Sequence, residues 1–167
     1  MHNFSTHSNR SLFAVHESMI DSMEQLYNIE STFFEAEDLC VAQGGHLPSI
    51  HSKEENELIY WLTTNGQAAT KESDHTWIGL RRKLFLWNYL TENQKNIYDE
   101  WVWTDGTPVD YIEWAPNQPD NFDKSESCAQ MFNAATGTVD KQFDEMAWND
   151  IKCSTKMKSF VCKFKNQ

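Results

Sequence analysis

The chain has 167 residues, a net charge of −11 and 13% aromatic residues, including seven Trp. This length and aromatic content are typical of a single domain with a sizeable core and exclude a disordered chain. The negative charge argues against nucleic acid and anionic membranes, because both attract Lys and Arg patches, and suits a cation as partner.

No apolar run reaches about 18 residues, so the sequence predicts no membrane-spanning helix. No signal peptide is recognised, so a secreted protein would be the mature form behind a start Met. The polar first residues carry two glycosylation sequons, at Asn3 and Asn9. Apolar residues from Leu12 to Leu26 then follow helical spacing, which predicts a short helix that joins subunits of a homo-oligomer, packs on its own domain or is partly disordered. We assign residues 1–26 to this N-terminal segment and residues 27–167 to the domain.

Two capping boxes, each a Thr or Ser followed three residues later by Glu, predict the starts of two helices. The first helix is expected over about residues 33–43 and the second from Ser52 to just before Gly66. Residues 46–50 between them are expected to form a short strand. No later segment shows a convincing helical pattern.

The remainder of the chain is predicted to form short strands and long loops. The expected strands are, in chain order, 77–80, 101–103, 128–132, 145–148 and 159–164. Helices followed by strands predict an α+β fold with an antiparallel sheet. The segment 104–127 is predicted to be a loop, and a loop of this length is usually functional. The stretch 81–100 is interpreted as an inserted loop.

The four cysteines are Cys40, Cys128, Cys153 and Cys162. Because no C-x2-C pair occurs, a zinc site is not predicted. Two disulfides in a protein outside the cytosol are favoured over four reduced, buried thiols. The spacing alone does not choose among the three possible pairings.

Eight short motifs follow one another along the chain: Phe34-Glu35-Ala36-Glu37-Asp38-Leu39-Cys40, Gly44-Gly45-His46-Leu47, Trp77-Ile78-Gly79-Leu80, Trp103-Thr104-Asp105-Gly106, Asn117-Gln118-Pro119-Asp120, Glu126-Ser127-Cys128, Trp148-Asn149-Asp150 and Phe160-Val161-Cys162. In this order, over about residues 27–164, they resemble the C-type lectin-like domain. The resemblance implies a C-type lectin-like fold with the disulfides Cys40–Cys162 and Cys128–Cys153. It also implies a cis bond between Gln118 and Pro119.

Five oxygen-bearing side chains stand at the family's calcium positions: Gln118, Asp120, Glu126, Asn149 and Asp150. Calcium prefers about six to eight oxygen ligands of this kind, so the resemblance implies one bound Ca²⁺. A second calcium, found in some relatives, is not predicted, because uncharged Asn121 and Ser127 replace its usual acidic ligands. The alternative is a solvated acidic loop without an ion.

The order Gln118-Pro119-Asp120 is similar to that of galactose and N-acetylgalactosamine binders, whereas Glu-Pro-Asn goes with mannose-type sugars. The resemblance implies sugar contacts from Gln118, Asp120, Phe122, Glu126 and Asn149. Phe122 stands where galactose binders carry an aromatic ring, usually Trp, that stacks on the sugar. The alternative is that Phe122 is a packing residue.

The resemblance therefore predicts a secreted, calcium-dependent lectin whose partners are glycans with terminal galactose or N-acetylgalactosamine. The alternative is a protein-binding domain of the same fold without a sugar ligand. It is favoured by an apolar cluster in the inserted loop, formed by Phe85, Leu86, Trp87, Tyr89 and Leu90. An enzyme is not predicted, because no nucleophile motif, phosphate loop or His-x3-His pattern occurs.

Overall fold

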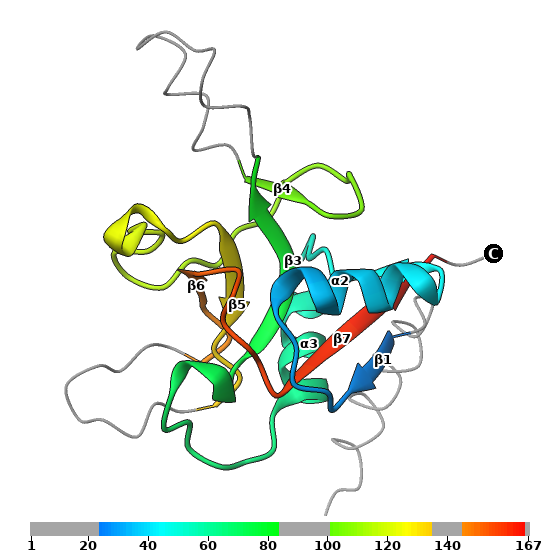
Figure 1. Ribbon diagram of the computed structural model, residues 1–167, viewed down its shortest axis with the longest axis horizontal. Helices are drawn as coiled ribbons and strands as arrows, with labels where there is room; N and C mark the ends of the chain where they lie inside the picture. Colours follow the sequence, from blue (N-terminus) through cyan, green and yellow to red (C-terminus); the bar gives the residue numbers. More distant parts are fainter. Residues whose placement is uncertain (1–23, 84–100, 135–144, 166–167) are drawn as a thin grey trace, which may run out of the picture.

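A computed structural model describes residues 24–83, 101–134 and 145–165. The helices are α2 (Phe33–Ala42) and α3 (Lys53–Thr63), with the short 3-10 helices η1 (Glu72–Asp74) and η4 (Phe122–Lys124). The strands are β1 (Glu24–Tyr27), β2 (Gly45–His46), β3 (Thr76–Arg82), β4 (Trp101–Trp103), β5 (Cys128–Met131), β6 (Trp148–Ile151) and β7 (Ser159–Phe164). Both α-helices pack against β7, and the long loop with η4 lies at the other edge of the sheet, beside β5 and β6 (Figure 1). The predicted α+β class is confirmed.

The described strands form one seven-stranded sheet in the order β1-β7-β3-β5-β6, with β2 beside β7 and β4 beside β3. Strands β3 and β7 run parallel, pairing Thr76 with Ser159 and Trp77 with Phe160, while the other strand pairs are antiparallel. The expected antiparallel pairing is thus confirmed for all described strand pairs except β3 with β7, which makes the sheet mixed. A parallel pair needs a long connection, which β4, β5, β6 and their loops supply here.

The first helix begins as its capping box predicts. The Thr32 hydroxyl accepts a hydrogen bond from the Glu35 N–H, and the Glu35 carboxylate accepts one from the Thr32 N–H. At the second helix the Ser52 hydroxyl accepts from the Glu55 N–H, but the Glu55 carboxylate accepts from the N–H of His51. Both predicted helices are thus confirmed, the second with a variant of the expected cap.

Several predicted boundaries are wrong. The strand expected at 145–148 lies at Trp148–Ile151, because the chain turns at Met146, whose φ is 74°. The strand expected at 46–50 covers only Gly45–His46, and beyond it the Leu47 N–H donates to the Glu37 carboxylate instead of a strand partner. Leu26, which the apolar spacing placed in a helix, lies in β1 and pairs with Val161 of β7.

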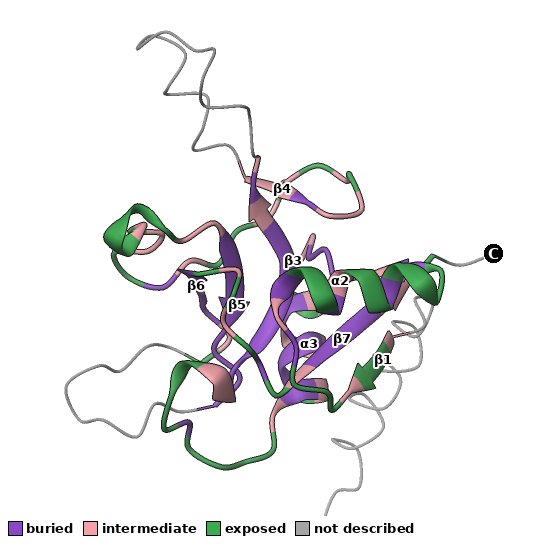
Figure 2. Cartoon of the chain, in the orientation of Figure 1, coloured by how far each residue is buried: buried purple, intermediate pink, exposed green. Residues whose placement is uncertain are grey.

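The core lies on both faces of the central strands, and Figure 2 shows β3, β5 and β7 as largely buried. Phe33, Trp77 and Phe160 pack in one buried cluster with the fully buried pair Cys40 and Cys162. Both implied disulfides are present, Cys40–Cys162 between α2 and β7 and Cys128–Cys153 between β5 and the segment after β6. The second disulfide anchors the chain just beyond the long loop.

The long loop is confirmed, since between β4 and β5 the chain forms no element except η4 and an isolated bridge at Trp114. Two other predicted features, the helix over residues 12–23 with its preceding sequons and the apolar cluster of the inserted loop, lie outside the described residues. None of the helices in the described part of the chain is long and apolar enough to cross a membrane.

Candidate metal and sugar site

The long loop is fastened to the sheet by its first half. The Trp148 N–H donates to the Glu113 carbonyl at 2.7 Å, and the Ala115 N–H donates to the Trp148 carbonyl at 2.9 Å. The Trp114 ring also packs edge-on against the ring of Trp148, with centroids 5.9 Å apart. Strand β6 therefore fixes where the loop approaches Asn149 and Asp150.

The next residues form a tight turn. The bond between Gln118 and Pro119 is cis, as the resemblance implied. The Gln118 N–H donates to the Ala115 carbonyl, and the Gln118 side-chain oxygen accepts from the Asp120 N–H at 3.2 Å. Asn121 has a φ of 50°, a left-handed conformation that short polar residues such as Asn adopt most easily after Gly. This turn directs residues 118–121 toward the end of β6.

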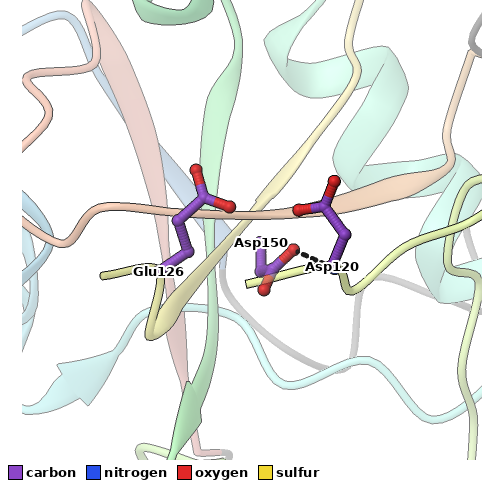
Figure 3. Close-up of side chains that lie close together, drawn as sticks. All are labelled: Asp120, Glu126 and Asp150. Carbon is purple, nitrogen blue, oxygen red and sulfur yellow. Dashed lines mark hydrogen bonds between the residues drawn. The ribbon is translucent and has the colours of Figure 1, made fainter. Parts of the chain in front are cut away.

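Three carboxylates meet at this point. One oxygen from each of Asp120, Glu126 and Asp150 lies within 4.8 Å of the other two, and the three side chains point toward a common space (Figure 3). Asp120 is exposed, Glu126 is half-buried and Asp150 is fully buried. The fold thus brings these three predicted ligands together, although Asp120 and Asp150 are 30 positions apart in the chain.

Asp150 is the anchor of the cluster. Its Oδ1 accepts from the Asp120 N–H at 2.9 Å, and its Oδ2 accepts from the Asn121 N–H at 2.9 Å and from Arg82 Nη2 at 3.1 Å. Because each carboxylate oxygen has two lone pairs, Oδ1 keeps one for a further partner. Asp150 can therefore hold the loop and still bind a cation.

Glu126 and Asp120 are joined through one backbone group. The Phe122 N–H donates to Glu126 Oε2 at 3.0 Å and to Asp120 Oδ1 at 3.1 Å. Asn121 Oδ1 accepts from the Glu126 N–H at 3.1 Å, which closes the loop on itself. A single N–H shared by two carboxylates leaves most of their lone pairs available.

The electrostatics of the cluster are unfavourable without a cation. Burial raises the pKa of the Glu126 carboxyl to about 7, and the Asp150 and Asp120 carboxylates also raise it. The Phe122 N–H acts in the opposite direction without cancelling these effects. At neutral pH the ion-free site therefore holds part of a proton that a bound cation would displace.

The two predicted amide ligands, Gln118 and Asn149, lie next to residues of the carboxylate cluster. Gln118 is half-buried and touches the cluster through its hydrogen bond to the Asp120 N–H. Asn149 is half-buried, directly precedes Asp150 in β6 and pairs with Gln130 of β5. Carboxylate and amide oxygens are the ligands that Ca²⁺ prefers, so the chemistry of this set fits that ion.

Phe122 is 64% exposed, next to the carboxylates whose oxygens accept from its N–H. This exposure argues against the alternative that Phe122 is a packing residue. An aromatic ring in this position offers an apolar face to a ligand that reaches the cluster.

Sequence reasoning missed Arg82 at this site. Its guanidinium pairs with Asp150, its Nε donates to the Glu126 carbonyl at 3.0 Å, and its Cζ lies 4.7 Å from the centre of the Trp101 ring. The interpretation of residues 81–100 as an inserted loop placed Arg82 outside the strand in which it lies. No local pattern marks a contact between residues this far apart in the chain.

Comparison with known proteins agrees with this architecture. The family model of the lectin C-type domain matches residues 29–164. The chain therefore belongs to the C-type lectin domain family, a family of binding domains. It is similar to an alpha-N-acetylgalactosamine-specific lectin from Patiria pectinifera, at 36% identity over 119 residues that cover 71% of this chain and 57% of that lectin. It is also similar to C-type lectin BML-1 from Bungarus multicinctus, at 31% identity over 84% of this chain and 75% of that protein.

Solved structures show the same fold. C-type lectin CEL-I from Cucumaria echinata superposes with a TM-score of 0.64 at 26% identity, over 88% of this chain and 92% of that one. A calcium-independent type II antifreeze protein superposes with a TM-score of 0.58 at 31% identity, over 86% of this chain and 85% of that one. The predicted C-type lectin-like fold is thereby confirmed. The relatives differ in what they are named for, so the ligand has to be argued from this chain's own site.

Proposed function

We propose that this chain is a secreted, calcium-dependent lectin that binds glycans with terminal galactose or N-acetylgalactosamine at the Gln118-Pro119-Asp120 loop. The observation that carries the proposal is the convergence of Asp120, Glu126 and Asp150 beside the exposed Phe122 ring. The similarity to an N-acetylgalactosamine-specific lectin supports the choice of sugar. The two disulfides support an oxidising location outside the cytosol.

Five side chains would hold the ion: Gln118, Asp120, Glu126, Asn149 and Asp150. When bound, one Ca²⁺ would supply the positive charge that attracts two neighbouring sugar hydroxyl oxygens. Asp120 and Glu126 would each accept a hydrogen bond from a hydroxyl, while the amides of Gln118 and Asn149 would donate to the same hydroxyl oxygens. Phe122 would stack on the apolar C–H face of galactose. These are binding roles, and none of them requires a chemical step.

The order of acid and amide would select the sugar. With Gln118 before the proline and Asp120 after it, one side of the hydroxyl pair meets an amide donor and the other a carboxylate acceptor. Galactose and mannose present their adjacent hydroxyls in different orientations relative to the ring. The ring of a galactose unit would then lie on the Phe122 side, where its apolar face is covered.

A glycan array tests the proposal, run with saturating calcium and again with a chelator. We expect binding to galactose- and N-acetylgalactosamine-terminated glycans in calcium, none in chelator, and inhibition by free galactose but not by free mannose. Asp123→Asn is the matched control, because Asp123 is an exposed acid of the same loop outside the predicted ligand set. It should bind like the wild type, whereas Glu126→Gln should bind no sugar.

The second candidate function is protein binding by a domain of this fold. The same fold occurs in the calcium-independent antifreeze protein, so a domain of this fold need not depend on calcium. If the protein is folded and monodisperse but binds no glycan on the array in calcium, this second function is favoured. Mannose-selective binding would keep the lectin and overturn the galactose assignment.

A further inference from the structure

Arg82 connects the carboxylate cluster to the sheet. It is the last residue of β3, and only 8% of its surface is exposed. Its guanidinium binds the Asp150 carboxylate on β6 and the Glu126 carbonyl at the end of the loop. Its Cζ lies over the ring of Trp101 on β4, which is its pairing partner in the sheet. One buried cation thus touches two strands and the loop.

The contacts of Arg82 continue into the loop backbone. Asp150, which Arg82 holds, accepts hydrogen bonds from the backbone N–H groups of Asp120 and Asn121. Arg82 and Asp150 together therefore fix residues 120 and 121 at one end of the carboxylate cluster. The bond from Arg82 to the Glu126 carbonyl, together with the Arg82 N–H donating to the Ser127 carbonyl, fixes the other end.

We propose that Arg82 is a resident cation of this site, which holds the loop in its ion-binding shape before calcium arrives and makes the folded loop less dependent on calcium. The inference rests on the proposed calcium site and names a positioning residue for it. Arg82 makes no contact with a ligand in this role. It acts through Asp150 and through the backbone at Glu126.

Charge counting indicates which state depends more on Arg82. Asp120, Glu126 and Asp150, fully ionised, sum to −3, and Arg82 reduces this to −2. A bound Ca²⁺ brings the sum to 0 with Arg82 and to −1 without it. Removing Arg82 therefore forfeits its attraction to three negative charges without calcium, but a net attraction to only one with calcium, because the two positive charges of the ion oppose it. Arg82 therefore stabilises the ion-free loop more than the ion-bound loop.

The test uses Arg82→Met, which keeps much of the side chain's volume and removes the charge. Thermal unfolding of the full chain is measured at about pH 8, where carboxyl groups are largely ionised, in calcium and in chelator. We expect the fall in Tm caused by the chelator to be larger in Arg82→Met than in the wild type. For a chain of this size a tenfold change in calcium affinity, about 1.4 kcal/mol, corresponds to a shift of about 3–6 °C in Tm. Arg82→Lys keeps the charge and should restore part of the difference.

Lys163→Met is the matched control. Lys163 is a partly buried cation that binds Glu55 and the Ser49 carbonyl, and its removal should lower Tm equally in calcium and in chelator. If Arg82→Met behaves like Lys163→Met, Arg82 is an ordinary structural residue and the inference is overturned. The inference is also overturned if Arg82→Lys restores none of the difference in Tm that Arg82→Met causes.

Amide hydrogen exchange separates this inference from the proposed function. In chelator the Asp120 and Asn121 amides should be protected in the wild type and unprotected in Arg82→Met, and calcium should restore protection in the variant. If the variant loses protection but calcium changes nothing in either protein, Arg82 holds the loop and the calcium proposal fails. If the amides stay protected in the variant, the Arg82 inference fails whatever calcium does.

Discussion

The carboxylates at the two ends of the long loop have opposite surroundings. At its start, Asp105 accepts hydrogen bonds from the Ser49 hydroxyl at 2.8 Å and from the N–H and hydroxyl of Thr107 at 2.9 and 2.6 Å. Burial raises the pKa of Asp105, but these bonds outweigh it and the pKa is lowered. At the other end, burial raises the pKa of Glu126 to about 7, and the carboxylates of Asp150 and Asp120 add to this effect.

This difference separates structural acids from acids that await a ligand. A lowered carboxyl pKa means that ionisation stabilises the folded protein at neutral pH, as it does for Asp105. A raised pKa means that the folded protein loses stability as the pH rises from the ordinary value of 4.5 to about 7, as it does for Glu126 in the absence of a cation. A protein gains nothing in stability from such a cluster unless something neutralises it, which is why we place the ligand here.

The largest effect is expected from removing the anchor of the cluster. Asp150→Ala takes a carboxylate partner from the buried Arg82, leaves the Asn121 N–H without its acceptor and leaves the Asp120 N–H with only Gln118, so it should lower the free energy of unfolding by about 3–5 kcal/mol. Denaturant unfolding measures this loss. The deficit should be larger in calcium than in chelator, because the variant cannot be stabilised by the ion.

Asp105→Ala is the counterpart at the structural end of the loop. It should cost about 1–3 kcal/mol, because the Ser49 hydroxyl and the Thr107 N–H lose their acceptor. This loss should be the same with and without calcium. A calcium-dependent loss in Asp105→Ala would remove the distinction between the two ends.

Calcium removal should affect the wild type next most strongly. A ligand present at a hundredfold excess over its dissociation constant stabilises the folded state by about 2.7 kcal/mol, which a chelator removes. Sugar binding should be lost over the same calcium range. The measurements are calorimetric melting and binding to immobilised galactose across a calcium titration, and melting that does not change with calcium would contradict the site.

Exchanging acid and amide around the proline should change the sugar without removing the ion. The double variant Gln118→Glu, Asp120→Asn keeps the formal charge of the five predicted ligands at −3 and their number unchanged. Calcium affinity should change modestly, while preference moves from galactose toward mannose. Competition by the two free sugars on one array measures this shift, and an unchanged preference for galactose would show that the order of these residues does not select the sugar.

The smallest effect is expected at Phe122. Stacking of an aromatic ring contributes about 0.5–1.5 kcal/mol beyond area burial, so Phe122→Ala should weaken galactose binding by up to about tenfold. Calcium affinity and Tm should change little, because the ring is exposed. Phe122→Trp, which enlarges the ring, should bind galactose at least as tightly as the wild type. Equal galactose affinity in all three proteins would remove Phe122 from the site.

Local signals explain what the sequence could predict. The capping box of Thr32 and Glu35 lies within four residues and marks the start of α2. The order of the family motifs predicted a calcium site, and the structure brings three of its five predicted ligands together, Asp120, Glu126 and Asp150.

What was missed depends on contacts across the chain. Arg82 and Asp150 are separated by 68 positions, and nothing near Arg82 distinguishes it from a solvent-exposed Arg. The parallel pairing of β3 with β7 and the displaced start of β6 likewise follow from packing and from a turn at Met146, not from strand propensity.

Isothermal titration of calcium in buffers of different ionisation enthalpy tests the central claim most directly, because it counts protons released on binding. With a Glu126 pKa of about 7 in the ion-free protein, binding at pH 7 should release about half a proton, and calcium affinity should fall about tenfold from pH 8 to pH 6. Glu126→Gln should release almost none. The absence of calcium binding would contradict a site built from Asp120, Glu126 and Asp150, and binding without proton release at pH 7 would contradict the raised pKa of Glu126.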